Sequence, residues 1–563
     1  MATTTVKKFT ATSTFGSGDG EFTPDDFAKF AAADFALITT AQAATLTSDY
    51  LAALKAAAIP SLTKVLPKIP GDALAGITTA AIASLPVASL TTDQLPALTL
   101  DQFGALSSAQ IAAFSSKQLA AIDSDHLGAI SAKSLVGLNI TNLKGDSINS
   151  LPAAQFSNLT TTQVAALTAA QLTALDADHF SSLTTGTAKA PGNLAGLKVT
   201  LLLSDAIAKL RPEQIVGLTS SQVAALTSIQ IGNLTEEQVS ALNSSDALSL
   251  SSKAISAFSV DKIELLSNEF IKAIPSATFK ALTAGELAKI TAEQAPSITS
   301  AQVSALSSTQ VSNLSAEATA ALTTAAIAGL NKNIAGLSLS ELSGDGQIAA
   351  LKPAQYALLS TAQIHALDSD GAALLTANTI AALTSAQIQA LDTLTLQSIA
   401  PEAIVGFTPK NILGLNTASG SDQIKALSSD QVAALTSVQA KALTTLQVSH
   451  LESVDIDALQ PATLAAITPA AFAKLDPLAF ASMTVDQIAK ITTAQIASIT
   501  VSQLHAIGAD QAVALTAAQL AKLTSTLATE LSTAAISALD TAAIGKLDIR
   551  AFGTTDDIKA LTA

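Results

Sequence analysis

Residues 427–450 decide the fold, because they read LSSDQVAA, LTSVQAKA, LTTLQVSH, three octads that each begin with leucine. The same pattern runs from Leu159 as LTTTQVAA, LTAAQLTA, LDADHFSS. We number the octad from its leading apolar residue. Position 2 is Thr, Ser or Asp, position 5 is mostly Gln, position 6 is Ile, Leu or Val, and position 8 is small, usually Ala. A fixed short period is the signature of a repeat architecture.

Each octad carries its own helix start. Thr or Ser followed three residues later by Gln is a capping box, in which the hydroxyl accepts from an early helical amide and the Gln side chain reaches back to the cap. Proline supports this start, because it gathers at position 3, the first helical residue, where its missing amide donor costs nothing. The prolines at this position are Pro212, Pro353, Pro409, Pro461, Pro469 and Pro477.

Two competing structures fit the pattern less well. In one continuous helix, eight residues at about 100° each overshoot two turns by roughly 80°, so the apolar positions would drift around the rod. In a β-strand, an apolar spacing of five then three would place successive large residues on opposite faces, and Ala and Gln are poor strand formers. The sequence therefore predicts an all-α solenoid of very short helices, with the octad L-[TSD]-x-x-Q-[ILV]-x-A stacking on its neighbours.

Composition restricts the classes of protein. The chain has 563 residues, a net charge of −15 and scattered basic residues, which makes nucleic acid an improbable partner. Mean hydropathy is +0.44, but Thr, Ser and Gln interrupt every octad, so no transmembrane segment is expected. No apolar stretch follows the first lysines, so a cleavable secretory signal is not expected. Cysteine is absent, which removes thiol chemistry and suits a secreted or surface protein.

The extent of the octad pattern predicts that the chain has two parts. Residues 1–70 form a predicted N-terminal module, with a short extended segment, a Gly-rich turn and a helix capped by Thr23, and the first clear octads start near Ile77. Residues 71–563 form the predicted octapeptide solenoid. Inserts interrupt its register near residues 139–150, 184–209, 333–350, 368–382 and 416–426. They are interpreted as longer turns, with a contact face as the functional alternative.

The last octads run on to Leu561 without the polar capping repeat that usually closes a solenoid. Two explanations remain open: the sequence is part of a longer protein, or the N-terminal region of one molecule covers the open end of the next. The second explanation predicts a head-to-tail filament.

Few residues suggest chemistry. The five histidines, which are His126, His179, His365, His450 and His505, belong to distant octads, so no catalytic, cofactor-binding or metal site is predicted for them. The aspartate pairs are low-ranked candidates for calcium ligands, although helix capping also explains them. The calcium candidates are Asp19, Asp123, Asp125, Asp176, Asp178, Asp368 and Asp370. Around Asp19 the EF-hand spacing fails, because aligning Gly20 with the loop glycine places Phe15 at the first ligand.

The repeated sequence pattern LTxxQ(I/V/L)AA resembles the Ala/Thr/Ser-rich short-repeat arrays of large bacterial surface and secreted proteins. The resemblance covers the chain from about Ile77 onward and rests on composition and period. It implies a bacterial, cell-surface or extracellular setting and a structural or adhesive role, and it carries no functional residues with it.

The expected function is therefore a non-enzymatic structural protein that self-assembles, head to tail, into an extracellular filament or surface coat. Its main partner would be itself, and export would not use a cleavable signal; a cytoplasmic location is the alternative. The alternative function is a monomeric binding module, an adhesin or scaffold that recognises a protein or glycan through inserts near Gly145, Gly344 and Gly420.

Overall fold

The structure, a computed structural model, describes residues 7–187, 192–342, 345–539 and 541–547. These residues form 52 α-helices of four to six residues and 13 short 3-10 helices. They contain no strand; Phe15 and Phe22 form an isolated β-bridge. The predicted all-α repeat architecture of very short helices is confirmed.

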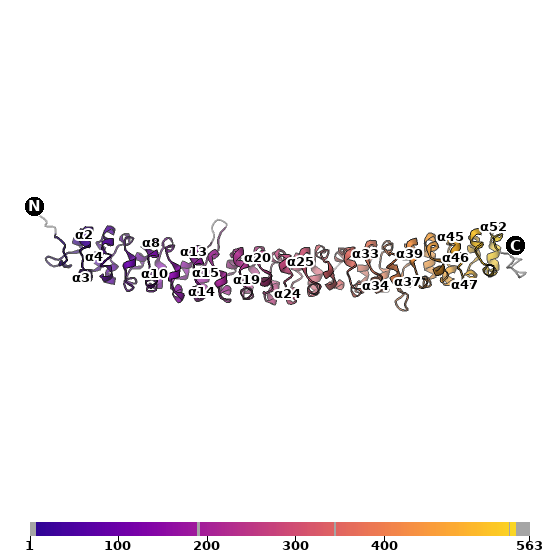
Figure 1. The fold of residues 1–563 in the computed structure, drawn as a ribbon, viewed down its shortest axis with the longest axis horizontal. Coiled ribbons are helices and arrows are strands. Elements are labelled where there is room, and N and C mark those ends of the chain that lie inside the picture. The colour runs from indigo at the N-terminus through magenta and orange to yellow at the C-terminus, as the bar shows by residue number, and fades with distance from the viewer. Residues whose placement is uncertain (1–6, 188–191, 343–344, 540, 548–563) are drawn as a thin grey trace. The chain divides into compact units, whose positions relative to one another are not determined.

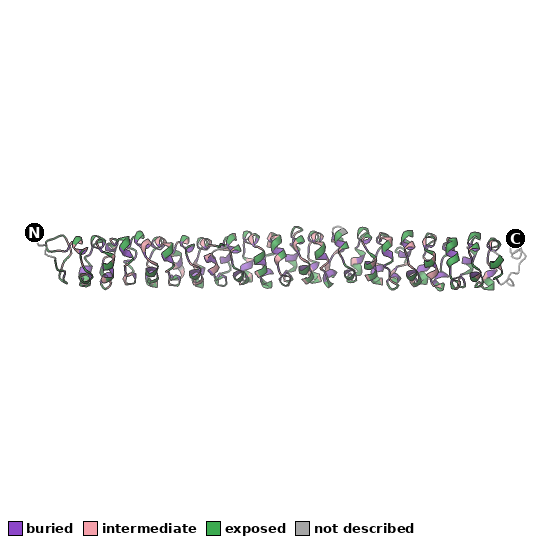
Figure 2. Cartoon of the chain, turned by 90° about the horizontal axis from the view of Figure 1, so that it is seen from above, coloured by how far each residue is buried: buried purple, intermediate pink, exposed green. Residues whose placement is uncertain are grey.

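The chain divides into two compact units, Met1–Ala281 and Leu282–Ala563. Helices α1 to α23 belong to the first unit and α24 to α52 to the second. Within each unit the helical turns follow one another in chain order (Figure 1). Buried residues line the inside of each turn and exposed residues its outside (Figure 2).

The octad explains each local element. Helices α38 (Ser429–Ala433), α39 (Ser437–Ala442) and α40 (Thr445–Val448) follow the caps Ser428, Thr436 and Thr444, each of which closes a capping box with the glutamine at position 5. Positions 1 and 6 supply the core, as with Leu435 and Val432, which are 4% and 0% exposed. Helices this short are marginal alone in water, so packing between turns must stabilise them.

The second unit shows how the turns stack. Each helix packs on the helix three places further along, so three helices make one turn and three columns run through residues 429–544. One column is α38, α41 (Ser453–Ala458), α44 (Pro477–Ala481) and α47 (Val501–His505). The second is α39, α42 (Pro461–Ala466), α45 (Val485–Lys490), α48 (Ala509–Val513) and α51 (Thr533–Ala538). The third is α40, α43 (Pro469–Phe472), α46 (Thr493–Ile496), α49 (Ala517–Leu520) and α52 (Thr541–Ile544).

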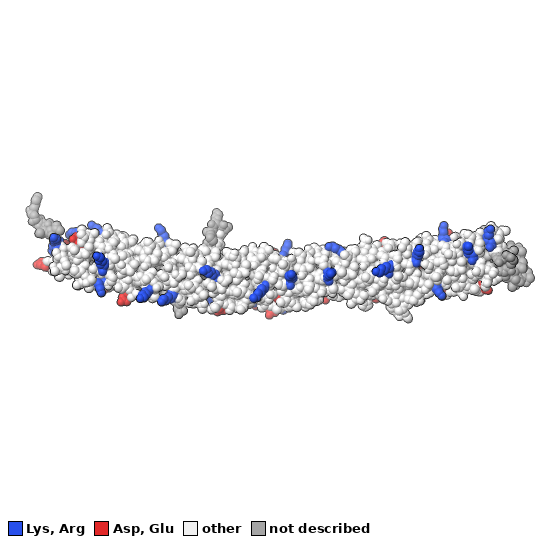
Figure 3. All heavy atoms as spheres, viewed as in Figure 1, with Lys and Arg blue, Asp and Glu red and all other residues white. Residues whose placement is uncertain are grey.

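The first unit follows the same rule. Helix α7 (Leu100–Ala105) packs on α10 (Ser124–Ala129), α12 (Ala153–Phe156) on α15 (Ala177–Ser182), and α17 (Ser220–Ala224) on α20 (Ser244–Ser249). Its surface and that of the second unit carry dispersed Lys, Arg, Asp and Glu side chains (Figure 3).

The regular helices begin earlier than Ile77. Helices α1 (Pro24–Phe27), α2 (Ala32–Phe35), α3 (Thr40–Ala43) and α4 (Ser48–Ala52) start after residues 23, 31, 39 and 47, which is the octad spacing. The sequence pattern hides this start because Phe22 and Phe30 stand at position 1 in place of leucine. Residues 7–22 pack on these helices through an aromatic cluster, in which Phe9 contacts Phe22 and Phe30 and Phe15 contacts Tyr50.

Most of the inserts are part of the stack. Residues 139–150 form η4 (Ile140–Asn142) and η5 (Gly145–Ser150), and 193–209 form η6 (Asn193–Gly196), η7 (Val199–Leu201) and η8 (Ala206–Lys209). Residues 333–350 include η11 (Lys332–Gly336), η12 (Leu339–Glu341) and α29 (Asp345–Ala349). Residues 188–191 and 343–344 of these inserts, among them Gly344, lie outside the described residues.

The remaining two inserts differ from each other. Residues 368–382 form two helices at ordinary octad spacing, α32 (Ser369–Ala373) and α33 (Ala377–Ala382), so the expected insert is absent there. The prediction of an insert was wrong because Gly371 and Thr379 replace glutamine at position 5, which makes these two octads hard to recognise in the sequence. Residues 416–422 form a loop that stands off the stack before α37 (Gln423–Ala426), with Gly420 at a φ of 86° (Figure 1).

Candidate functional site

The most regular polar feature is a series of buried glutamines at position 5. In α45 the backbone N–H of Thr484 donates to Gln487 Oε1 at 2.8 Å, while Gln487 Nε2 donates to the carbonyls of Ile456 and Leu459 at 2.6 and 2.7 Å. Those carbonyls lie at the end of α41. One carboxamide therefore serves unpaired groups at the start of one helix and at the end of another, which is why it can be buried. We call these glutamines and their bonds the glutamine ladder.

Each ladder glutamine bonds to carbonyls at the end of another helix, and the number of residues between the glutamine and those carbonyls varies. Gln487 reaches back 31 and 28 residues through uninterrupted octads. Gln163 reaches back 28 and 25, because Leu138 and Leu143 enclose a shortened octad. Gln431 reaches back 35 and 32, across the loop at 416–422. In each case the acceptors are the same two carbonyls at a helix end, so insertions and deletions are absorbed between ladder positions.

Other donors replace glutamine at position 5. Asn411 Nδ2 donates to Ile380 O at 2.8 Å, and Thr463 Oγ1 donates to Leu435 O at 3.1 Å. In His126 the Nε2 atom donates to Leu98 O at 2.8 Å. Position 5 therefore requires a donor more than it requires glutamine itself.

Three buried acids occupy the same position. Asp246 and Asp455 accept from their N-cap amides at 2.9 and 2.8 Å, and Glu286 accepts from Thr283 N at 2.6 Å. Burial raises the pKa of the Asp246 carboxyl, and it raises the pKa of Asp455 to about 6. Glu286 Oε1 is buried without a hydrogen-bond partner among the described residues. An ionised carboxylate cannot donate to a carbonyl, so these octads lack part of the ladder.

The calcium candidates are structural caps or surface residues. Asp123, Asp176 and Asp368 are N-caps that accept from the N–H of His126, His179 and Gly371 at 2.8 to 3.0 Å. Those amide hydrogen bonds hold the pKa of the Asp123 and Asp176 carboxyls below the usual range. The remaining candidates, which are Asp19, Asp125, Asp178 and Asp370, are exposed surface residues. Across the described ranges, no group of three or more His, Cys, Asp and Glu side chains could hold a metal ion.

The five histidines are spread along the stack, each with its own partner. His126 and His179 take position 5 and lie 2.6 Å from the aspartate caps of their own helices. His365 Nδ1 lies 3.1 Å from Ala390 O, and His505 Nε2 lies 2.7 Å from Glu530 Oε2. His450 pairs with Asp422, at the base of the loop at 416–422, with 2.6 Å between Nδ1 and Oδ2.

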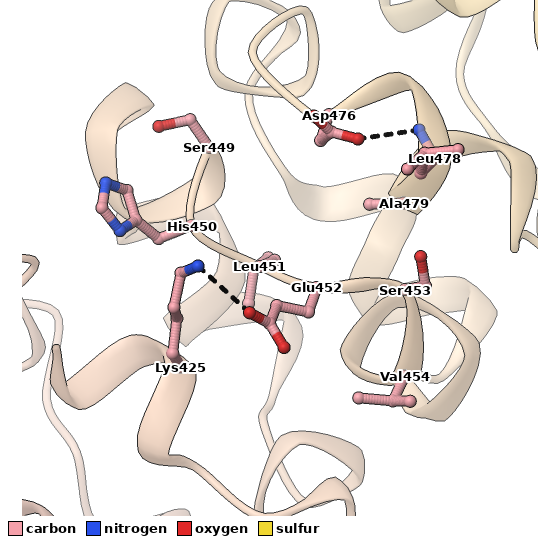
Figure 4. Close-up of a pocket in the computed structure, with 10 residues that line it drawn as sticks. All are labelled: Lys425, Ser449, His450, Leu451, Glu452, Ser453, Val454, Asp476, Leu478 and Ala479. Atoms are coloured by element: carbon pink, nitrogen blue, oxygen red, sulfur yellow. Dashed lines mark hydrogen bonds and ion pairs between the residues drawn. The ribbon is translucent and has the colours of Figure 1, made fainter.

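A groove lies beside His450. It encloses about 390 Å³ and is lined by Lys425, Ser449, His450, Leu451, Glu452, Ser453, Val454, Asp476, Leu478 and Ala479. Lys425 Nζ lies 3.1 Å from Glu452 Oε1 on one side, and Asp476 Oδ1 accepts from Leu478 N at 2.8 Å on the other (Figure 4). Val454 and Leu478 are 61% and 76% exposed. The groove combines carboxylates, a lysine and exposed apolar side chains, and it is the candidate binding site of the second unit.

Residues 100–132 and 411–445 each match the ALTTAQ repeat family. The second match spans α38 and the loop beside the groove. No curated protein matches the chain. The chain is therefore a repeat protein with a helical, solenoid-like fold. None of the described helices has the length and apolar character needed to cross a membrane.

The sequence analysis did not single out the groove residues. Ala479 stands at position 5, where the pattern expects glutamine, but so does Ala471 one octad earlier, so this departure from the pattern does not by itself mark the groove. The position-5 glutamines were predicted to close capping boxes, which the structure confirms. Their second role, as donors to another helix, requires knowing which helix end lies next to each carboxamide.

Proposed function

We propose that this chain is a non-enzymatic structural protein that assembles with copies of itself. The observation that carries the proposal is an apolar stripe on three successive turns of the second unit, formed by Val454, Leu478 and Val501, which are 61%, 76% and 40% exposed. They belong to α41, α44 and α47, which pack one on the next. Exposed apolar residues that gather on neighbouring turns mark contact surfaces for other proteins.

The stripe supports side-by-side contact between copies more than head-to-tail contact. The N-terminal module, residues 1–70, was expected to cover the open end of a neighbouring molecule. Within it, residues 7–22 pack on their own chain, where Gln42 Nε2 donates to Thr10 O and Ser13 O at 3.2 and 2.8 Å. The terminal octad at Leu561, which head-to-tail contact would use, lies outside the described residues. We propose that the assembly forms outside the cell or at its surface, a location that the absence of cysteine suits.

The test is sedimentation velocity and negative-stain electron microscopy of the full chain. The variant Val454→Lys/Leu478→Lys places two charges on the stripe, and Ile229→Lys is the matched control, since Ile229 is 67% exposed at position 4 of an octad in the other unit. We expect wild type and control to form the same filaments or sheets and the double variant to stay monomeric. Monomeric wild type, or assembly of the double variant, would contradict the proposal.

A second candidate is a binding module that recognises a partner through its inserts. It is favoured by the groove, which lies beside the loop at 416–422 and contains His450, whose ring pairs with Asp422 at the base of that loop. Replacing residues 417–421 by a shorter turn should then remove partner binding without changing the assembly of the chain.

A further inference from the structure

The groove exists where the glutamine ladder is interrupted. Ala479 stands at position 5 of its octad, and its side chain ends far short of the place that a carboxamide occupies in neighbouring octads. It is 2% exposed and points between the Leu451–Glu452 backbone and Asp476 (Figure 4). Position 5 is glutamine at Gln487, Gln495 and Gln503, in the next three octads, and alanine at Ala471 in the octad before, which does not line the groove.

The partners that a glutamine would use are present. In the next octads Oε1 accepts from the N–H of the N-cap residue, and Nε2 donates to carbonyls 31 and 28 residues earlier. Counting back from Ala479 gives the N–H of Asp476 and the carbonyls of Val448 and Leu451. Leu451, Asp476 and Ala479 all line the groove. Among the described residues, neither Asp476 N–H nor Leu451 C=O has a hydrogen-bond partner.

Proline at the start of α44 does not prevent this arrangement. Pro212 and Pro353 also begin helices, and there Gln214 and Gln355 still accept from the preceding N-cap amides at 2.8 and 2.7 Å. Gln355 Nε2 also donates to two carbonyls, both at 2.9 Å. The backbone around Ala479 is therefore of a kind that accepts a carboxamide.

We propose that the groove at Ala479 binds a primary carboxamide from outside this chain, such as a glutamine side chain of a partner polypeptide. The carboxamide oxygen accepts from Asp476 N–H and its NH₂ group donates to Leu451 O. Leu478 and Val454 cover the aliphatic stem of the ligand, as exposed apolar side chains at the rim of a polar pocket do. The charged side chains of the groove have partners within the chain: Lys425 Nζ lies 3.1 Å from Glu452 Oε1, and Asp476 Oδ1 accepts from Leu478 N at 2.8 Å.

The site does not depend on self-assembly. The apolar stripe includes Leu478 and Val454, but the carboxamide contacts belong to backbone groups of residues 451 and 476. A variant that fills the position of the missing side chain can therefore close the site without changing the charge or the apolar residues of the stripe.

The experiment is saturation-transfer NMR of the full chain with propionamide. Butanone, which has the same shape but a methyl in place of NH₂, and propionate, which only accepts, are the control ligands. We expect propionamide to bind about tenfold more tightly than butanone, because only the amide makes both hydrogen bonds. Equal binding of butanone and propionamide would overturn the proposal.

Two variants test whether propionamide binds at Ala479. Ala479→Gln supplies the missing carboxamide from the chain itself and should reduce propionamide binding to the level of butanone. Ala471 also stands at position 5 without a carboxamide, but it does not line the groove. Ala471→Gln, one octad earlier, should therefore leave propionamide binding unchanged. Circular dichroism of both variants should show wild-type helicity, and Ala479→Gln should unfold at or above the wild-type temperature. Propionamide binding that survives in folded Ala479→Gln would overturn the assignment.

A further probe distinguishes the source of the ligand. N-acetyl-glutamine N-methylamide carries the same carboxamide on a peptide backbone, and N-acetyl-glutamate N-methylamide is its control. Binding of the glutamine compound supports a partner polypeptide as the source. Binding of propionamide alone supports a free small amide and overturns the polypeptide source.

Discussion

At the scale of single residues, position 5 decides how well two turns are joined. A buried carboxamide is stable there because its oxygen and its nitrogen are both bonded, whereas a buried polar atom without a partner costs free energy. Glu286 retains the bond from Thr283 N at 2.6 Å but leaves Oε1 buried without a partner among the described residues.

Glu286→Gln should therefore stabilise the protein. It keeps the accepting oxygen and replaces the unpaired oxygen by an NH₂ group, so we expect the free energy of unfolding to rise by about 1–3 kcal/mol. The reverse change, Gln487→Glu, should lower it by a similar amount, because it removes the donor to Ile456 O and Leu459 O. Urea unfolding followed by circular dichroism measures both. A less stable Glu286→Gln variant would contradict this explanation.

Asp455 should make stability depend on pH. Burial raises the pKa of its carboxyl to about 6 in the folded chain, above the usual value near 3.9 in the unfolded chain. The folded state therefore binds the extra proton between about pH 4 and pH 6. The stability that Asp455 contributes is fully present below about pH 4 and is lost as the pH rises through 6.

The measurement is the difference in unfolding temperature between wild type and Asp455→Asn, taken from pH 4 to pH 8. Asparagine at position 5 makes the ladder bonds in Asn411, where Nδ2 donates to two carbonyls. We expect Asp455→Asn to be clearly more stable at pH 7 and the advantage to shrink as the pH falls below 6. An advantage that is independent of pH would show that Asp455 does not titrate in this range.

At the scale of the helix, the packing of one turn on the next is limited by how closely their backbones can approach. Gly137, at position 8, lies against the backbone of Ser108, and a Cβ atom there would be 1.9 Å from Ser108 O. Small residues at position 8 were predicted to permit close neighbours, and this glycine shows the extreme case.

Gly137→Ala should therefore destabilise the first unit by about 1–3 kcal/mol, the usual cost of overpacking. The matched control is Gly232→Ala, at the end of α18 (Ser228–Gly232), where the nearest atom, Ala257 O, would lie at an ordinary 3.4 Å. Thermal unfolding should be nearly unchanged for the control, since alanine is also the better helix former. Equal losses in both variants would contradict the close-approach argument.

Much of the helix-scale structure could be predicted from the sequence. Thr436 and Gln439 predict a capping box, and Leu435 predicts the core, because capping and apolar period are local properties. Phe22 and Phe30 concealed the first helices, since a search for leucine misses them. The groove at Ala479 could not be read, because it depends on Leu451 lying beside a residue 28 positions later, and that distance is set by how many helices form a turn.

At the scale of the whole molecule, the N-terminal segment distinguishes the two modes of self-assembly. Residues 7–22 supply the acceptors for Gln42 and part of an aromatic cluster. Deleting residues 1–21 should expose the first turn and lower the unfolding temperature, but side-by-side assembly should continue. Electron microscopy of the deletion variant decides the question, because head-to-tail filaments would be lost.

The ladder has a direction. Each of its carboxamides donates to carbonyls that come earlier in the chain, from Gln42 with Thr10 and Ser13 to Gln519 with Ile488 and Ile491. During synthesis on the ribosome, every acceptor therefore emerges before its donor, and a new turn always meets a finished one. A chain drawn through a pore with its N-terminus first would rebuild itself in the same order, with residues 7–22 as the first platform.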